Sequence, residues 1–119
     1  MAEHNKLGNL GEDIAEDFLI KNGYEIRERN WRFRKAEIDI IAENEAYLIA
    51  VEVKTRSTAD FGDPQDFVSE KKIQLLVEAI NAYVEQNDID KEIRFDIIAL
   101  VKEKDDFKIE HLEDAVFYY

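Results

Sequence analysis

The sequence predicts a single α/β domain in which helices cover a mixed β-sheet. Residues 10–19 and 73–84 carry apolar side chains at helical spacing. Residues 36–43, 47–54 and 93–101 are rich in Ile and Val, which favour strands. The 119 residues, of which 45% are hydrophobic, suffice for one compact core and leave little room for a second.

The chain opens with a predicted helix over about residues 9–22. Leu10, Ile14 and Phe18 recur at helical spacing. Gly23 follows and is expected to cap the helix, because glycine readily adopts the left-handed conformation that ends many helices.

Three strands are expected next. Residues 24–31 alternate between apolar and charged side chains, which indicates a strand. Residues 36–43 and 47–54 are separated by the short polar stretch 44–46, so we expect an antiparallel hairpin. Residues 55–66 contain the only proline of the chain and many polar side chains, and are expected to form a loop.

A second helix and two strands complete the predicted order. The helix is expected over about residues 68–86, with Ser69 as its N-cap. Residues 93–101 form the fourth predicted strand, and residues 107–112 pair with it. A long helix between the third and fourth strands implies a right-handed parallel crossover, so the sheet is expected to be mixed.

Composition excludes several classes of protein. The absence of cysteine removes disulfide frameworks, zinc fingers and thiol nucleophiles, and suits a cytoplasmic location. No apolar run approaches the roughly 20 residues of a membrane helix, and the N-terminal residues lack the apolar core of a signal peptide. The formal charge of −12 opposes nonspecific binding to a phosphate backbone. We therefore expect one cytoplasmic domain over residues 1–119 that does not enter a membrane.

The predicted hairpin brings like charges together. Strand alternation places Glu37 and Asp39 on one face, and Ile38 and Ile40 on the other. Glu52 and Lys54 share a face on the next strand in the same way.

The register of the hairpin decides which charges meet. If it closes through residues 44–47, Asp39 lies across from Glu52 and Glu37 lies across from Lys54; a two-residue loop shifts the pairs but keeps the faces. Opposed carboxylates repel, so a sheet that carries them needs a compensating cation. Glu37 is either a group that supports the metal ligands or the cross-strand partner of Lys54, and we favour the structural role.

A divalent metal is the simplest such cation. Carboxylate oxygens suit Mg²⁺ or Mn²⁺, which retain waters and commonly bind substrate phosphates. We expect Asp39 and Glu52 to hold the metal, and Lys54 to orient the attacking water or to stabilise charge on the phosphate. Glu12 is expected to complete the metal shell, directly or through water, and Glu16 is a weaker candidate.

A cationic segment interrupts the acidic sequence. Residues 27–35 carry five positive charges and one negative. Candidate nucleic-acid-binding residues are Arg29, Arg32, Arg34, Arg56 and Lys71, with Lys72 as an alternative to Lys71. Trp31 and Phe33 are expected either to stack on bases or to belong to the core.

These motifs resemble a known superfamily. Asp39 followed by Glu52-Val53-Lys54 looks like the D…ExK core of the PD-(D/E)XK nucleases, whose element order is the one predicted above. A closer resemblance, over nearly the whole chain, is to the YraN-like family of small bacterial proteins, which is similar to archaeal Holliday-junction resolvases. The segments that carry it are Gly8 to Glu12, Gly23-Tyr24, Arg29-Asn30, Glu37 to Ala42, Val51 to Arg56, and Phe61-Gly62 with Pro64.

The resemblance implies a fold and a site. The fold is a restriction-endonuclease-like three-layer sandwich with a helix-strand-strand-strand-helix-strand core. The nuclease-type site comprises Glu12, Asp39, Glu52 and Lys54. The sequence departs from the family at Ala36, where glycine is usual, and this change leaves every proposed ligand in place.

Other polar and terminal residues have simpler interpretations. His4 and His111 are expected to be surface or packing residues, and Asp96 has no assigned role. The apolar residues 115–119 are expected to dock on the domain or on another copy, which makes a homodimer a candidate assembly.

The leading hypothesis is a metal-dependent endonuclease-like protein that acts on DNA, with branched or damaged DNA in repair or recombination as candidate substrates. The alternative is a catalytically inactive nucleic-acid-binding or adaptor protein that keeps the nuclease fold. Another metal-dependent phosphoryl-transfer activity ranks last, because the sequence has no G-x-x-x-x-G-K loop.

Overall fold

The computed structural model describes residues 2–56 and 69–115, with side chains from Leu10 onward. Its elements follow the predicted order of helix, three strands, helix and two strands. They are α1 (Ala2–Lys21), β1 (Glu25–Phe33), β2 (Ala36–Glu43), β3 (Tyr47–Arg56), α2 (Glu70–Asn87), β4 (Glu92–Glu103) and β5 (Asp106–Leu112).

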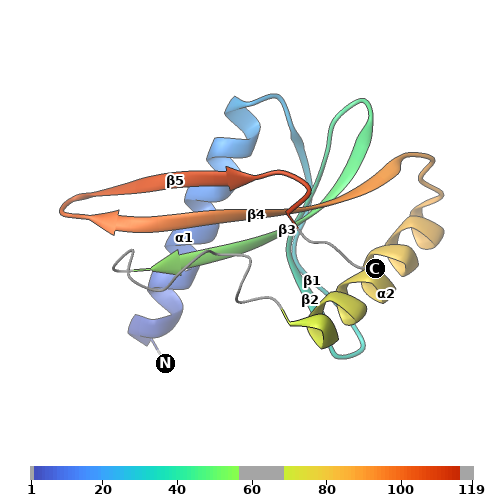
Figure 1. The fold of residues 1–119 in the computed structure, drawn as a ribbon, viewed down its shortest axis with the longest axis horizontal. Coiled ribbons are helices and arrows are strands. Elements are labelled where there is room, and N and C mark those ends of the chain that lie inside the picture. The colour runs from blue at the N-terminus through green and yellow to red at the C-terminus, as the bar shows by residue number, and fades with distance from the viewer. Residues whose placement is uncertain (1, 57–68, 116–119) are drawn as a thin grey trace.

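The five strands form one mixed sheet in the order β1-β2-β3-β4-β5. Neighbouring strands are antiparallel except β3 and β4, which are parallel and are joined through α2. Side chains that alternate along β3 enter two separate cores: Leu48 packs with α2, and Ile49 packs with α1. The helices therefore cover opposite faces of the sheet, as the ribbon in Figure 1 illustrates. This arrangement confirms the predicted α/β sandwich around a mixed sheet.

Local signals set most element ends. Gly23 adopts a φ of 91° after α1, and its N–H donates to the Ile20 carbonyl at 3.1 Å. Ser69 caps α2, because its hydroxyl accepts from the Lys72 N–H at 3.2 Å. Strands β1, β3 and β4 each end two residues later than predicted, and the start of α1 differs most. Helix α1 begins at Ala2 rather than near residue 9, and β3 continues through Arg56 into the segment predicted as a loop.

Strand alternation fails within β2, which corrects a prediction. Ile38 packs in the core beside α2, whereas Ile40, two residues later, packs in the core beside α1. The ladder pairs Arg29 with Ile40 and Trp31 with Ile38, so Asn30 and Asp39 stand between these pairs. Asn30 has a φ of 51°, a conformation that reverses the phase of the side chains. Ile38 and Ile40 therefore do not share a face.

Three expectations concern residues or side chains that the structure does not describe. They are the remainder of the predicted 55–66 loop, the role of His4, and the docking of the apolar C-terminal residues beyond Ala115. Neither of the described helices combines the length and the apolar character needed to span a membrane.

Candidate functional site, a carboxylate and lysine pocket

The site lies where β2 and β3 separate. Their ladder begins at the predicted closure, where the Asn44 N–H donates to the Tyr47 carbonyl at 3.1 Å, and its last pair is Ile40 with Val51. Beyond that pair β3 remains bonded to β4 through Arg56. An open pocket of about 400 Å³ lies beside this point. Its lining combines residues of β2, β3, α2 and the β1–β2 turn: Lys35, Ala36, Glu37, Asp39, Glu52, Ser69, Lys71, Lys72, Leu75 and Leu76.

Asp39 bridges the separating strands. Its Oδ2 accepts a hydrogen bond from the Val53 N–H at 2.8 Å. The side chain thus partners a backbone group of β3 beyond the last β2–β3 pair. The register in this stretch is the one predicted for closure through residues 44–47, and it brings Asp39 and Glu52 to the same pocket.

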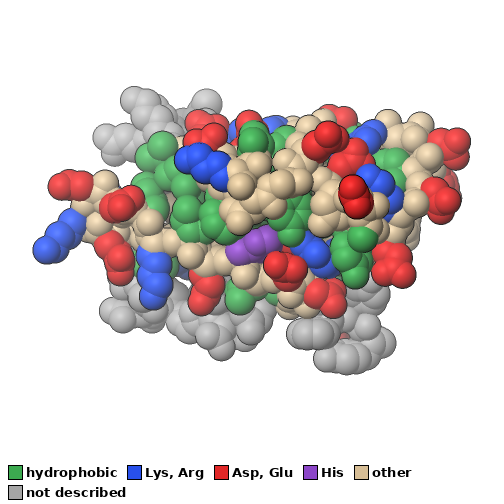
Figure 2. Space-filling view, turned by 90° about the horizontal axis from the view of Figure 1, so that it is seen from above, with side chains coloured by type: hydrophobic (Ala, Val, Ile, Leu, Met, Phe, Trp, Pro, Cys, Tyr) green, Lys and Arg blue, Asp and Glu red, His purple; other side chains and the backbone are tan. Residues whose placement is uncertain are grey.

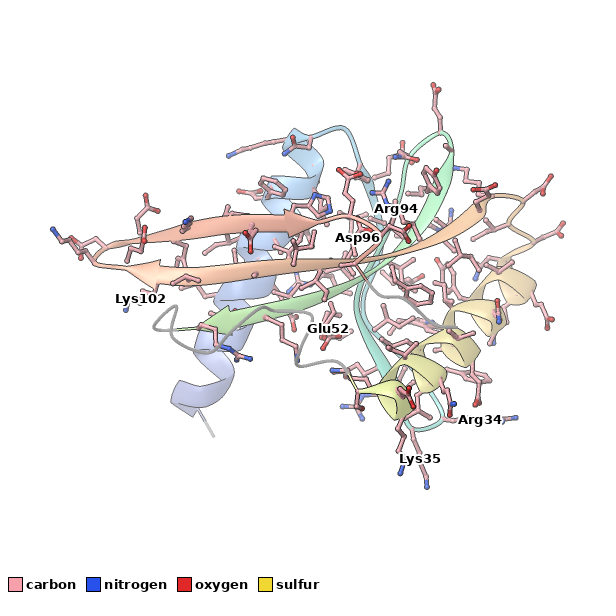
Figure 3. All side chains as sticks on the ribbon, viewed as in Figure 1. Arg34, Lys35, Glu52, Arg94, Asp96 and Lys102 are labelled. Atoms are coloured by element: carbon pink, nitrogen blue, oxygen red, sulfur yellow. The ribbon has the colours of Figure 1, made fainter. Side chains whose placement is uncertain are left out.

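Glu52 is buried and has two ammonium partners. Its side chain is 8% exposed, and its Oε2 lies 3.3 Å from the Lys54 Nζ. The Lys72 ammonium, from the first turn of α2, contacts the same oxygen. Alternation along β3 places Val51 and Val53 in the opposite core, so Glu52 and Lys54 share a face as predicted. Figure 3 shows Glu52 on β3 near the start of α2.

The electrostatics of the pocket favour a cation. Burial, and after it the nearby Glu52 carboxylate, raises the pKa of Asp39 to about 7. Glu12 also raises this pKa, whereas the Val53 N–H and the Lys72 charge lower it. The ionised Asp39 is therefore disfavoured beside Glu52 in a partly dehydrated space, and a positive ion between the two carboxylates would favour it.

Glu12 reaches this region because α1 packs closely on β3. A Cβ placed on Gly11 would lie 2.2 Å from the Thr55 Oγ1, so only glycine permits this approach without a shift. The Glu12 carboxylate, 16% exposed, lies 3.3 Å from an Arg29 guanidinium nitrogen. Glu12 therefore acts on Asp39 through its charge while its own ion pair is with Arg29.

The carboxylates of the pocket determine which metal ion it can hold. Within residues 2–56 and 69–115, no group of three or more His, Cys, Asp and Glu side chains is placed to hold a metal. Mg²⁺ and Mn²⁺ need less than that, because one or two carboxylates with waters and substrate phosphates complete their shell. Asp39 and Glu52 fit this requirement by chemistry, and the structure gives Glu12 no place in a three-carboxylate group.

Of the arginines predicted to bind nucleic acid, Arg29 forms ion pairs within the fold, whereas Arg32 is exposed. The Arg29 guanidinium is engaged by carboxylates of α1, at 2.8 Å from Glu16 and 3.2 Å from Asp13 in addition to Glu12. It fixes β1 to α1. Arg32 is 78% exposed and pairs with Glu37 at 2.8 Å. Glu37 is thus the partner of Arg32 and not of Lys54, because β2 and β3 have separated at this level.

The exposed cations gather at one end of the pocket. Lys35, in the β1–β2 turn, and Lys71, in the first turn of α2, both line it. Arg34 precedes Lys35 and lies over the Phe33 ring at 5.1 Å. Figure 3 shows Arg34 and Lys35 together at the turn, close to the start of α2. Arg56 is the last residue of β3, the strand that carries Glu52, and is half-buried.

The aromatic residues of the cationic segment belong to the core. Trp31 packs edge-on against Tyr83 of α2 with ring centroids 5.1 Å apart, and stacks on Phe33 at 6.2 Å. Both are packed against the core beneath α2. Of the two interpretations open from the sequence, packing is the one that the structure supports.

A second charged cluster had no assigned role in the sequence. The Asp96 side chain is fully buried on β4 and accepts from Arg94 at 2.8 and 2.9 Å, and His111 lies 2.7 Å from it. The Asp114 N–H also donates to Asp96, at 3.0 Å. Burial raises the pKa of Asp96, but the hydrogen bonds from His111 and Arg94 outweigh it and hold the pKa below its usual range. This cluster joins β4 to β5. A charge within the apolar run 93–101 was the sequence signal for it.

Fold and site together define an α/β protein whose pocket combines paired carboxylates with lysines at the parting of two sheet strands. Comparison with known proteins gives its family. Residues 11–100 match the family described as "Uncharacterised protein family UPF0102", and the chain belongs to this family. The match agrees with the YraN-like resemblance found in the sequence.

Relatives of similar length support this assignment. The chain is 64% identical to a UPF0102 protein of Flavobacterium psychrophilum and 58% identical to one of Christiangramia forsetii, each over 119 residues and the whole of both chains. A UPF0102 protein of Phocaeicola vulgatus is 49% identical over 117 residues, which cover 98% of this chain and 97% of that one.

Proposed function

We propose that the protein is a divalent-metal-dependent endonuclease-like enzyme that hydrolyses DNA phosphodiester bonds. The observation that carries the proposal is the convergence of Asp39 and Glu52 on one pocket, where Glu52 is buried, the Lys54 Nζ lies 3.3 Å from its Oε2, and the pKa of Asp39 is raised to about 7. Strongly perturbed carboxylates in a pocket are typical of functional sites. The likeness to the D…ExK core of PD-(D/E)XK nucleases supports the same activity.

Each residue of the pocket has a role that its position permits. Asp39 and Glu52 would hold Mg²⁺ or Mn²⁺, which when bound lowers the pKa of a water and neutralises charge on the phosphate. The Val53 N–H keeps the Asp39 carboxylate in place at 2.8 Å. Lys54 Nζ, 3.3 Å from Glu52, donates to the attacking water or to a phosphate oxygen as charge develops.

The surface charge limits how the substrate is held. The formal charge of −12 repels a phosphate backbone over much of the surface, and Figure 2 shows acidic side chains scattered across the face seen from above. Lys35 and Lys71 offer positive charge at the pocket itself. Substrate contacts therefore concentrate at the pocket, and branched or damaged DNA, which exposes its backbone in unusual geometry, is the proposed substrate.

The same acidity favours a second candidate, a nucleic-acid-binding or adaptor protein without catalytic activity. Such a protein keeps the pocket as a binding site only. Metal-dependent turnover separates the two candidates.

Cleavage of labelled DNA tests the proposal. Single-stranded, duplex, flap and four-way-junction substrates are incubated with Mg²⁺ or Mn²⁺, and binding is measured separately by fluorescence anisotropy. We expect cleavage that needs the metal and falls at least about 100-fold in Glu52→Ala and Lys54→Ala. Glu110→Gln, at an exposed position of β5, is the matched control and should cut like the wild type. Binding of DNA without cleavage by the wild type would favour the adaptor.

A further inference from the structure

The position of Lys72 around the axis of α2 directs its side chain into the pocket. It shares one helical face with Leu76 and Tyr83, which are buried in the core, at spacings of four and eleven residues. Ser69 fixes this first turn by accepting from the Lys72 N–H at 3.2 Å. Lys71 has the other phase and is exposed. Only the Lys72 ammonium contacts Glu52 from α2 among the described residues.

The two lysines on Glu52 are not equivalent. Lys54 belongs to the same strand as Glu52 and is 19% exposed. Lys72 comes from a different element and is 38% exposed, so its ammonium has a path to solvent. Its charge also acts on Asp39, where it favours the ionised carboxylate. Lys72 therefore supplies one positive charge at the two carboxylates that the proposed function assigns to the metal.

We propose that Lys72 is a competing cation for Glu52, which neutralises the carboxylate in the metal-free protein and is displaced when a divalent ion binds. This inference rests on the proposed function. A buried carboxylate without a partner is costly, so the ammonium preserves the empty pocket and at the same time lowers its affinity for metal. Lys72 is thus a positioning residue for the site.

Once a metal displaces it from Glu52, the Lys72 ammonium can bind a substrate phosphate. The released side chain remains tethered to the first turn of α2, beside Lys71 and at the pocket that Lys35 also lines. These three cations then face the space that a substrate phosphate would enter, so a phosphate replaces Glu52 as the partner of Lys72. We therefore expect metal and phosphate to bind with positive coupling. The metal replaces the Lys72 ammonium as the partner of Glu52, and the phosphate then becomes the partner of that ammonium.

Direct measurement of metal affinity tests the inference without any turnover. Mn²⁺ binding is measured by titration calorimetry, in the absence of DNA, for the wild type, Lys72→Met, Lys72→Arg and Lys71→Met. We expect Lys72→Met to bind Mn²⁺ with a Kd at least about tenfold lower than that of the wild type, a change equal to about 1.4 kcal/mol. Lys72→Arg keeps the charge and should bind like the wild type. Lys71→Met removes a charge from the same helix turn and should change the Kd much less than Lys72→Met.

A second readout follows the ammonium itself. Acetylation of wild-type lysines is quantified by mass spectrometry with and without Mn²⁺. We expect Mn²⁺ to raise the reactivity of Lys72 and to leave that of Lys71 unchanged.

The outcomes distinguish the inference from the proposed function. Wild-type binding of Mn²⁺ with an equal or higher Kd in Lys72→Met would overturn the inference and leave the proposed function standing. Equal gains in Lys71→Met and Lys72→Met would also overturn it, since the effect would then be one of general charge. Absence of Mn²⁺ binding in the wild type and in Lys72→Met would overturn both.

Discussion

Replacing Asp39 with Asn should stabilise the metal-free protein at pH 8. The carboxyl has a pKa of about 7 in the folded chain against an ordinary value of 3.8, so its ionisation opposes folding. At 1.36 kcal/mol for each pKa unit, this difference corresponds to about 4 kcal/mol at pH 8. The amide is not identical to the protonated acid, and the pocket relaxes around a charge. We therefore expect a gain of about 1–3 kcal/mol in the free energy of unfolding.

The sign of the pH dependence is specific to this carboxyl. Because its folded pKa is raised, the folded chain holds the proton between about pH 4 and pH 7 while the unfolded chain has lost it. The stability contributed by Asp39 is therefore present near pH 4 and is lost as the pH rises through about 7. Asp39→Asn lacks this loss, so its advantage over the wild type should grow between pH 4 and pH 8.

Urea denaturation with EDTA provides the measurement. Trp31, the only tryptophan, packs on Tyr83 and reports unfolding by its fluorescence. Asp90→Asn, at an exposed position between α2 and β4, is the control for a generic change of charge. If Asp39→Asn were less stable than the wild type at pH 8, the ionised Asp39 would not oppose folding. An equal gain in the free energy of unfolding at pH 4 and pH 8 would likewise contradict a raised pKa of Asp39.

Three further predictions follow from packing and charge. Gly11→Ala should destabilise the protein by about 1–3 kcal/mol in urea denaturation, because the new Cβ would lie 2.2 Å from the Thr55 Oγ1, and adding Thr55→Ala should restore most of the loss. Asp96→Asn should cost about 3–5 kcal/mol at pH 7, since it breaks a buried ion pair. The lowered pKa of Asp96 means that its stabilisation exists above about pH 4 and is lost as the pH falls, so the same variant should be less sensitive to acid in a thermal melt. Replacing Arg34 and Lys35 together with Ala should weaken DNA binding and reduce the slope of log K against log salt by about 2, measured by anisotropy; an unchanged slope would place the phosphates elsewhere.

The element order was predictable because local signals agree with the tertiary fold. Residues 36–43 and 47–54 carry β-branched side chains around a short polar turn, and the observed register follows from closure at that turn. Gly23 and Ser69 mark helix ends by their backbone and hydroxyl chemistry. Where such signals are absent, as at the N-terminal end of α1, the predicted boundary was wrong by several residues.

The faces of β2 were not predictable from alternation. Asn30 on the neighbouring strand takes a positive φ, and at that level the side chains of β2 change from the core beside α2 at Ile38 to the core beside α1 at Ile40. Asp39, which stands opposite, then turns to the Val53 N–H. An Asn tolerates this conformation better than most residues, but nothing in its sequence context distinguishes it from an Asn in a regular strand.

The carboxylates of the site were easier to predict from the sequence than its lysines and arginines. Asp39 and Glu52 reach one pocket because strand spacing fixes their positions, and Lys54 lies 3.3 Å from Glu52 on the same strand. The choice between Lys71 and Lys72 depends on helix phase, and the spacing of Lys72 to Leu76 was the available signal. Arg29 could not be separated from the surface arginines, since its partners lie on α1, far from it in the sequence.

The variant Asp39→Asn is the most direct test of the proposal that this pocket performs metal-dependent hydrolysis. Rates of Mn²⁺-dependent cleavage are compared for the wild type and the variant on the best DNA substrate, with affinity for that DNA measured on the same samples. We expect the variant, although more stable, to bind the DNA and to cut it at least about 100-fold more slowly. Cleavage by Asp39→Asn at the wild-type rate would contradict the proposal.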